Sequence, residues 1–447
     1  MRLWIKDPIA VLADGAERGL VVENGRIAEL VGRGREPVSP VDRVYDASRH
    51  VIIPGLINTH HHFFQTLTRA HPKAINKELF PWLQALFPIW GAYVNSENYR
   101  LGVRLALTEL LMSGCTTASD HHYLYPPGIE DAMDVEDQEA TTLGMRMTLT
   151  RGSLDLRPTD GGLTVERILQ DPDVILADSE RVIAKYHDPS EGSYRQVALA
   201  PCAPFNASRE VMVESAKMAE RCNCRLHTHL GETTDETDYC LAHFNCRPVD
   251  YLEEVGWMND RVWLAHGIHF NDAEVARLGA HGVGVSHCPT SNMVLASGNC
   301  RTKELEAAGA PVGLGVDGSA SNDNSNLMEA VRHAMMIGRL TYNAEKVTHL
   351  DALRWATAGS ARCLGRDDIG TIALGKQADL AFYTLDELRF SGAGDPIAAL
   401  VLCGAHKADR VMIGGHWRVE DGMPIGIDIR KLRAEHGAAA AKFLQDL

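Results

Sequence analysis

The chain has 447 residues, of which 45% are hydrophobic and 23% are charged, so it is long enough for a large core with a second, smaller domain. Its formal net charge is -15 and no Lys/Arg-rich run interrupts this balance, so we expect neither a nucleic-acid nor an anionic-membrane partner. An uncharged small molecule would not be repelled by this negative charge.

The first residues show no long apolar stretch followed by a small-residue cleavage site, and no later run approaches about eighteen apolar residues. The 10 cysteines are scattered, and no C-x-x-C pair is present. This usage favours reduced thiols over a disulfide framework or a zinc ribbon. The sequence therefore predicts a cytoplasmic protein without a signal peptide or membrane span.

The two ends of the chain carry short β-type patterns. Residues 19–31 contain two apolar runs around Asn24-Gly25, which is a strong hairpin signal, and similar runs lie at 378–383 and 411–419. Because chain ends often lie close together, we predict one small β-sandwich domain from residues 1–56 and 365–447. The tail, 430–447, is expected to form a final amphipathic helix in that domain.

The middle of the chain alternates apolar strand-like runs with helical patterns. Eight such runs begin at Val51, Cys115, Met145, Val197, Cys224, Val262, Val283 and Val312. Eight βα units in about three hundred residues favour a closed (β/α)8 TIM-like barrel, so an α/β catalytic domain is predicted over residues 57–364. An open, doubly wound sheet is the alternative.

Histidines follow the first run directly. Because alternate residues of an extended strand share a face, His60 and His62 can point together into the barrel while His61 points away. Such a pair is either a set of metal ligands or two hydrogen-bonded core residues.

Further polar residues end the later runs. These are His227, His229 and Glu232 after the fifth run, His266 after the sixth, His287 after the seventh and Asp317 after the eighth. The strand ends of a barrel form its catalytic face, and unrelated core histidines would not gather repeatedly at one end of successive strands. We therefore expect a catalytic site there.

Five spaced motifs and a C-terminal segment resemble the amidohydrolase superfamily, in its cytosine/guanine deaminase and chlorohydrolase-like branch. They are Pro54-Gly-Leu-Ile-Asn-Thr-His-His-His62, His229-Leu-Gly-Glu232, Ala265-His-Gly267, His287-Cys-Pro-Thr-Ser-Asn292, Val316-Asp-Gly-Ser-Ala-Ser-Asn322 and the segment 370–380. The resemblance covers nearly the whole chain.

The resemblance implies a ligand set for one divalent metal ion. The ligands would be His60, His62, His229 and Asp317. Zinc is the expected ion, with iron and manganese left open. Three imidazoles and one carboxylate leave room for a water whose pKa the metal lowers.

The same resemblance implies the groups that move protons. Glu232 would be the acid/base, close enough to take a water proton and return it to a ring nitrogen, His266 would assist, and Asp317 would relay the next proton to ammonia. Two-metal members of the superfamily carry a carboxylated Lys after the fourth strand, whereas residues 200–205 contain none. A single-metal site is expected.

Four residues in the predicted loops are candidates for substrate binding. Gln65 could read a ring edge, Arg151 could hold a carbonyl oxygen, Trp82 could stack on a flat ring, and His121 could line the pocket. A solvated Gln, an ordinary salt bridge and simple loop packing are the competing interpretations.

The segments 60–69 and 150–153 are most similar to bacterial 8-oxoguanine deaminases, and hydroxyatrazine-type aminohydrolases share much of them. The resemblance implies hydrolysis of 8-oxoguanine by water to urate and ammonia, so the expected partner is a small heterocyclic substrate. It also implies that the protein is a homo-oligomer. The alternatives are guanine, isocytosine or a hydroxytriazine, hydrolysis of another bond such as carbon–halogen, and an inactive relative.

Overall fold

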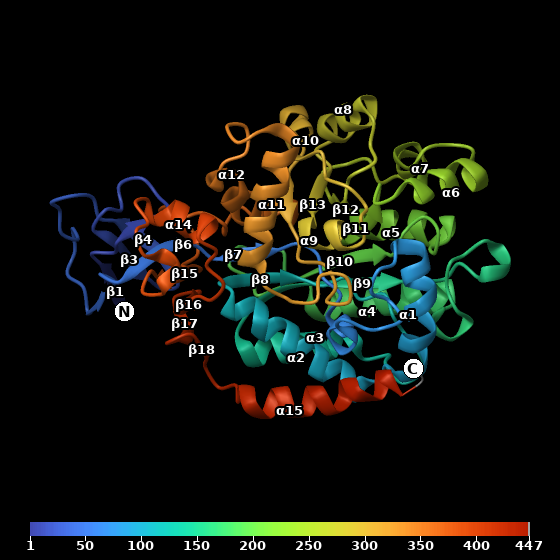
Figure 1. Cartoon of the computed structure of the whole chain (residues 1–447), viewed down its shortest axis with the longest axis horizontal. Coiled ribbons are helices and arrows are strands. Elements are labelled where there is room, and N and C mark those ends of the chain that lie inside the picture. Colours follow the sequence, from blue (N-terminus) through green and yellow to red (C-terminus); the bar gives the residue numbers. More distant parts are fainter. Residues whose placement is uncertain (446–447) are drawn as a thin grey trace.

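The computed structural model describes residues 1–445, and its centre is a closed barrel of eight parallel strands (Figure 1). Each strand is a short, buried run. In barrel order from the first, the strands are β7 (Leu56–Asn58), β8 (Cys115–Ser119), β9 (Arg146–Ser153), β10 (Arg195–Pro201), β11 (Arg225–Leu230), β12 (Val262–His266), β13 (Gly284–His287) and β14 (Val312–Leu314). The closed barrel confirms the predicted fold class and excludes the open sheet.

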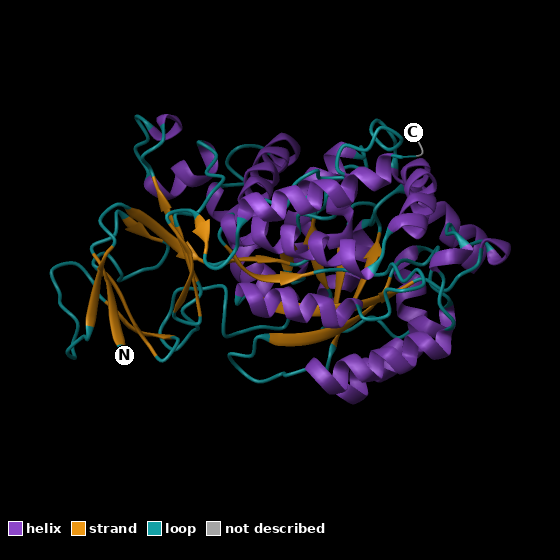
Figure 2. Cartoon of the chain, turned by 90° about the horizontal axis from the view of Figure 1, so that it is seen from below, coloured by secondary structure: helices purple, strands orange, loops and turns teal. Residues whose placement is uncertain are grey.

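Helices connect successive strands or follow the last of them, and they enclose the barrel (Figure 2). They are α2 (Ser96–Met112), α3 (Ala132–Leu143), α4 (Pro172–Tyr186), α5 (Arg209–Cys222), α7 (Pro248–Glu254), α8 (Asp272–Ala280), α10 (Thr302–Ala308), α11 (Leu327–Tyr342), α12 (His349–Arg354) and α13 (Ser360–Cys363). Shorter or additional elements lie in the loops after the strands. These are the 3₁₀ turn η1 (Phe63–Thr68), α1 (Leu79–Tyr93), α6 (Thr234–Phe244) and α9 (Pro289–Val294). No helix in residues 1–445 is both long and apolar enough to cross a bilayer.

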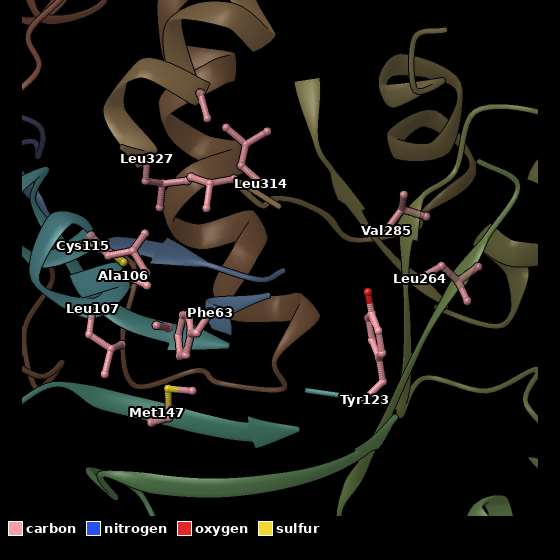
Figure 3. Close-up of a cluster of buried hydrophobic side chains, with 14 of the residues drawn as sticks. Phe63, Ala106, Leu107, Cys115, Tyr123, Met147, Leu264, Val285, Leu314 and Leu327 are labelled. Atoms are coloured by element: carbon pink, nitrogen blue, oxygen red, sulfur yellow. The ribbon is translucent and has the colours of Figure 1, made fainter. Parts of the chain in front are cut away.

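The packing between strands and helices is continuous (Figure 3). Leu107 of α2, Met147 of β9 and Leu264 of β12 are at most 2% exposed and belong to one core cluster. A core packed this way holds the strands in fixed register, and their carboxyl ends therefore provide a rigid frame for polar side chains.

The first apolar run, which we assigned to the barrel, belongs to another sheet, and that prediction is wrong. Residues 50–54 form β6 (His50–Pro54), which pairs with β15 (Leu380–Thr384) of the small domain. The barrel begins only with β7, after Gly55, where a Cβ would lie 2.3 Å from side-chain atoms of Thr116. Pro54-Gly55 thus divides one apolar stretch between two sheets.

Both chain ends build the small β domain. One sheet contains β4 (Arg26–Leu30), β3 (Gly19–Glu23), β1 (Arg2–Lys6) and β5 (Arg43–Asp46). The other contains β18 (Met423–Pro424), β17 (His416–Glu420), β16 (Arg410–Ile413), β15, β6 and β2 (Ala10–Val11). Ile5 and Leu20 of the first sheet share a buried cluster with Phe382 of the second, so the sheets form a sandwich.

The C-terminal helix lies against the barrel. After α14 (Pro396–Leu402) and the last strands, α15 (Ile429–Ala440) runs beside α2 (Figure 1). His436 Nε2 lies 3.1 Å from the Thr66 hydroxyl, and the Phe443 carbonyl oxygen lies 3.1 Å from His71 Nε2. The structure thus places the helix on the barrel and not on the sandwich, and the last two residues of the predicted tail, 446 and 447, lie outside the described residues.

Candidate active site

Three histidines and one aspartate converge at the carboxyl ends of the strands. His60 and His62 directly follow β7, His229 lies in β11, and Asp317 follows β14. The Oδ1 atom of Asp317 lies 3.4 Å from His60 Nε2 and 3.3 Å from His62 Nε2. The Nε2 atoms of His62 and His229 are 3.2 Å apart. The four residues whose side chains we expected to bind the metal therefore lie together, and all are buried.

Backbone carbonyls fix the tautomers of two of these rings. The Nδ1–H of His62 donates to the carbonyl oxygen of His121 at 2.8 Å, and the Nδ1–H of His229 donates to that of Cys202 at 2.7 Å. Because a carbonyl oxygen only accepts, each Nδ1 carries the hydrogen and each neutral ring presents a lone pair at Nε2.

The third ring is fixed through a second histidine. His227 Nδ1 lies 2.7 Å from the carbonyl oxygen of Trp263, which makes Nδ1 the donor and leaves His227 Nε2 as an acceptor. That acceptor lies 2.8 Å from His60 Nδ1. His60 therefore donates from Nδ1 and also presents its lone pair at Nε2.

These donor atoms fit a divalent metal ion. Within residues 1–445, His60 Nε2 is buried without a hydrogen-bond partner, and His60, His62 and His229 each offer one atom to a common group within 4.8 Å. Burial lowers the pKa of His62 to about 3, so the ring is neutral at neutral pH. Three lone pairs and a carboxylate that face one another are stabilised by a cation at their centre.

Glu232 and His266 stand beside this group. Glu232 follows β11, and its Oε2 lies 3.4 Å from Nε2 of His266, which in turn is 4.0 Å from Asp317 Oδ2. The Nδ1–H of His266 donates to Oδ1 of Asn292 at 2.9 Å. Burial raises the pKa of Glu232 to about 7. Burial also opposes a charge on His266, but the two carboxylates outweigh it and raise the pKa of that ring.

Backbone strain occurs at the same place. His266 and Asp317 both adopt left-handed conformations, with φ of 75° and 66°. Side chains other than glycine reach this region at a cost of about 1–3 kcal/mol, and such strain gathers at functional sites. The barrel therefore imposes these two side-chain directions on the chain.

A cavity opens onto the cluster. Its walls include His62, His229, Glu232, His266 and Asp317 together with apolar side chains from the loops. Two of the residues predicted to bind substrate are part of this wall. Gln65 lies on η1, and Trp82 lies on α1 with its Nε1–H donating to the carbonyl oxygen of Ala320 at 3.0 Å.

The other two predicted substrate residues point elsewhere. Arg151 lies inside β9 and pairs with Asp178 of α4 at 2.9 Å, so it faces the helix layer and not the cavity. The His121 ring stacks on His229 with centroids 4.6 Å apart, and its Nε2 lies 2.8 Å from the Ala200 carbonyl oxygen. His121 therefore supports a ligand from behind, and its carbonyl orients a second one.

Sequence reasoning missed Asn206 and the role of His227. Asn206 lines the cavity and is 1% exposed, yet neither Oδ1 nor Nδ2 has a hydrogen-bond partner within the described residues. Its position just beyond the fourth strand was an available signal. His227 was recognised as a strand-end histidine, but its contact with His60 joins two distant strands and leaves no local pattern.

A barrel of this kind, with convergent imidazole ligands and a buried carboxylate beside them, defines a metal-dependent hydrolase. The model of the family described as "Amidohydrolase family" matches residues 51–418. The chain belongs to this family.

Individual relatives cover almost all of the chain. It is 57% identical to an 8-oxoguanine deaminase of Pseudomonas aeruginosa, over 99% of both chains. It is 36% identical to a hydroxydechloroatrazine ethylaminohydrolase of a Pseudomonas species, over 96% of this chain and 89% of that one. The solved atrazine chlorohydrolase of Arthrobacter aurescens, complexed with zinc, superposes with a TM-score of 0.92 at 28% identity, covering 98% of this chain and 100% of that chain.

Proposed function

We propose that the chain hydrolyses the exocyclic amine of a purine-like ring, with 8-oxoguanine as the substrate and urate and ammonia as the products. The observation that carries the proposal is that Glu232 and His266 face the same cavity as three of the four ligand residues, namely His62, His229 and Asp317. The high identity to an 8-oxoguanine deaminase supports the choice of ring.

His60, His62, His229 and Asp317 would hold one zinc ion. When bound there, such an ion lowers the pKa of a water and polarises it for attack. The hydrogen bonds from Nδ1 of the three histidines keep their lone pairs directed inward, so the ligands need little rearrangement.

Glu232 carries the central proton transfer in this proposal. Its carboxylate accepts a proton from the attacking water and returns it to a ring nitrogen, which makes the amino-bearing carbon electrophilic. A pKa of about 7 suits both directions of transfer. The second proton of the water passes through Asp317 to the departing amine. The C–N bond breaks, a C=O bond forms and ammonia leaves.

His266 assists as a hydrogen-bond donor. Asn292 fixes the ring through Nδ1, and the neighbouring carboxylates favour a proton on Nε2. An N–H directed at the reacting centre stabilises negative charge that develops there.

The ring would be recognised by amides and an indole. Asn206 and Gln65 each carry a donor and an acceptor, which match the adjacent N–H and C=O groups of an oxidised purine. Among residues 1–445, neither Oδ1 nor Nδ2 of Asn206 has a hydrogen-bond partner. A buried amide without a partner is unfavourable, and this supports a role of Asn206 in binding the ring. Trp82 would pack against the ring face.

A substrate panel tests the proposal. Zinc-loaded protein is assayed for ammonia and chloride release with 8-oxoguanine, guanine, isocytosine, a hydroxytriazine and a chlorotriazine. We expect 8-oxoguanine to have the highest kcat/KM. Comparable or faster turnover of a triazine would contradict the purine substrate, and the absence of ammonia from every ring would contradict deamination.

We also propose a cytoplasmic location and a homo-oligomeric assembly. All ten cysteines are unpaired in residues 1–445, which fits a reducing compartment. Light scattering of the purified protein in solution gives the oligomeric state, and a monomeric mass would contradict the assembly.

A further inference from the structure

A buried carboxylate lies directly behind Glu232 and takes no part in the proposed proton transfers. Glu236 belongs to the first turn of α6 and is 0% exposed. Its Oε2 accepts from the Glu232 backbone N–H at 3.0 Å, and the Gly231 backbone N–H interacts with the same carboxylate. Leu230 and Gly231 join the ligand His229 to Glu232. Glu236 therefore holds the segment that sets the direction of the Glu232 side chain.

The bond from Glu232 to Glu236 is not an ordinary helix cap. Glu236 is the third residue of α6, and in a capping box a glutamate at this position accepts from the backbone N–H of the N-cap residue. The N-cap of α6 is Thr233, whose side chain makes no cap hydrogen bond, and the bond to Glu236 comes from the residue before it. By contrast, Asn271 and Glu274 form an ordinary capping box at α8. The Glu236 carboxylate thus binds Glu232 and not the end of its own helix.

Residues 230–232, which we call the catalytic turn, are also held from the opposite side. The carbonyl oxygen of Gly231 accepts from the backbone N–H groups of Ile268 and His269 at 2.8 and 2.9 Å. These two residues belong to the loop that follows His266 at the end of β12. The catalytic turn is therefore bound through its carbonyl to the His266 loop and through its N–H groups to the carboxylate of α6.

The position of the Glu232 carboxylate depends on the turn that carries it. Its Oε2 lies 3.4 Å from His266 Nε2, and Glu232 lines the cavity together with Asp317. Catalytic groups must be held to within about 0.5 Å, and a displacement of about 1 Å can lower a rate by about 10²-fold. Among the described residues, the cavity wall includes Glu232 but not Glu236. Glu236 can therefore influence the reaction only through the groups that it holds.

We propose that Glu236 is a positioning residue for the reaction, which rests on the proposed function of Glu232. By accepting from the backbone N–H groups of the catalytic turn, Glu236 keeps the Glu232 carboxylate beside His266 and the metal ligands. It exchanges no proton with the substrate. The competing role is a purely structural one, in which Glu236 stabilises the fold or the metal site without affecting Glu232.

A double-mutant cycle separates these roles. The kcat and KM for 8-oxoguanine are measured for zinc-loaded wild type, Glu236→Leu, Glu232→Gln and the double variant. We expect Glu236→Leu to lose about 10²-fold in kcat with little change in KM. In the Glu232→Gln background the same substitution should cost less than about threefold, because the group that Glu236 positions is already lost. Equal losses in both backgrounds would overturn the proposal.

Two further variants serve as rescue and control. Glu236→Gln keeps one oxygen that can accept from Glu232 N–H, so its kcat should fall by only about tenfold. Asp235→Asn removes a charge from the exposed side of the same helical turn, and we expect it to retain the wild-type kcat. Elemental analysis and thermal unfolding give the zinc content and the folded fraction. A loss of kcat that only follows the loss of zinc or of folded protein, or a wild-type kcat in folded Glu236→Gln, would overturn the proposal.

Crystal structures test the positioning without turnover. In zinc-loaded Glu236→Leu and Glu236→Gln we expect the four ligand side chains to superpose on those of the wild type. The Glu232 carboxylate should move by about 1 Å or more from its place beside His266 in the Leu variant, and by less in the Gln variant. An unmoved Glu232 in both would overturn the proposal. Wild-type protein that releases no ammonia would contradict the proposed function, whereas these structures would still decide whether Glu236 positions Glu232.

Discussion

Replacement of His227 by Phe isolates the hydrogen bond that orients His60. The His227 ring stacks on Trp263 with centroids 4.3 Å apart at an angle of 10°, and a phenyl ring preserves that packing. The substitution removes the acceptor that lies 2.8 Å from His60 Nδ1 and leaves a buried N–H unpaired. Loss of such an outer partner lowers metal affinity by about 10–100-fold, which equals about 1.4–2.8 kcal/mol of binding free energy.

The assay is competition for zinc between the protein and a chromophoric chelator. His227→Gln is the matched control, because its Oε1 can accept from His60 in place of the imidazole nitrogen, and we expect it to recover most of the lost affinity. Thermal unfolding followed by circular dichroism establishes that both variants are folded. A folded His227→Phe protein that binds zinc as tightly as the wild type would refute the orienting role of His227.

Four further outcomes follow from the site and its frame. Glu232→Gln should retain metal by elemental analysis and lose about 10²–10⁴-fold in kcat, and a rate near that of the wild type would contradict its role in proton transfer. Since burial raises the pKa of Glu232 to about 7 and only its ionised form accepts a proton, kcat/KM should fall about tenfold per unit as the pH drops below that value, whereas a flat profile would count against this assignment. Asn206→Leu should lower kcat/KM for 8-oxoguanine by about 10–100-fold, mainly through KM, and an unchanged KM would place Asn206 outside the binding site. Asp379→Ala leaves the buried Arg146 guanidinium without the carboxylate 2.7 Å away, so denaturant titration should show a loss of about 3–5 kcal/mol in unfolding free energy, and a loss below about 1 kcal/mol would contradict a tight pair between barrel and sandwich.

The parts of the fold that follow local patterns could be predicted from the sequence. The βα alternation predicted a closed barrel because each strand is a short apolar run bounded by turns. The positions of His60 and Asp317 directly after such runs were enough to place them at one end of the barrel. The first strand was assigned wrongly because residues 51–57 form one stretch without a polar side chain. Its division at Pro54-Gly55 shows in the pairing of β6 with β15, hundreds of residues away, and of β7 with β8.

Side-chain directions could not be predicted where they depend on strand length or on distant partners. Arg151 was expected beyond the end of its strand, but β9 continues to Ser153. The side chain is therefore governed by strand alternation and turns toward Asp178 of α4. The Asn206 side chain faces the cavity because the loop after β10 turns inward, which no local periodicity records.

The contacts behind the ligands show why the four metal-binding side chains alone do not specify the site. The lone pair of His229 depends on the Cys202 carbonyl, which follows β10, and that of His60 depends, through His227, on the carbonyl of Trp263 in β12. His229 and His62 are thus oriented by the backbone next to them in the barrel, whereas His60 is oriented by a side chain of β11, which does not pair with β7. A shift of one residue in the pairing of β11 with β12 would remove the acceptor from His227 Nδ1. The tautomer of His227, and with it the orientation of the His60 ring, would then no longer be fixed, although the sequence would still contain every ligand. The register of the barrel, held by its core, therefore determines the direction of the ligand lone pairs.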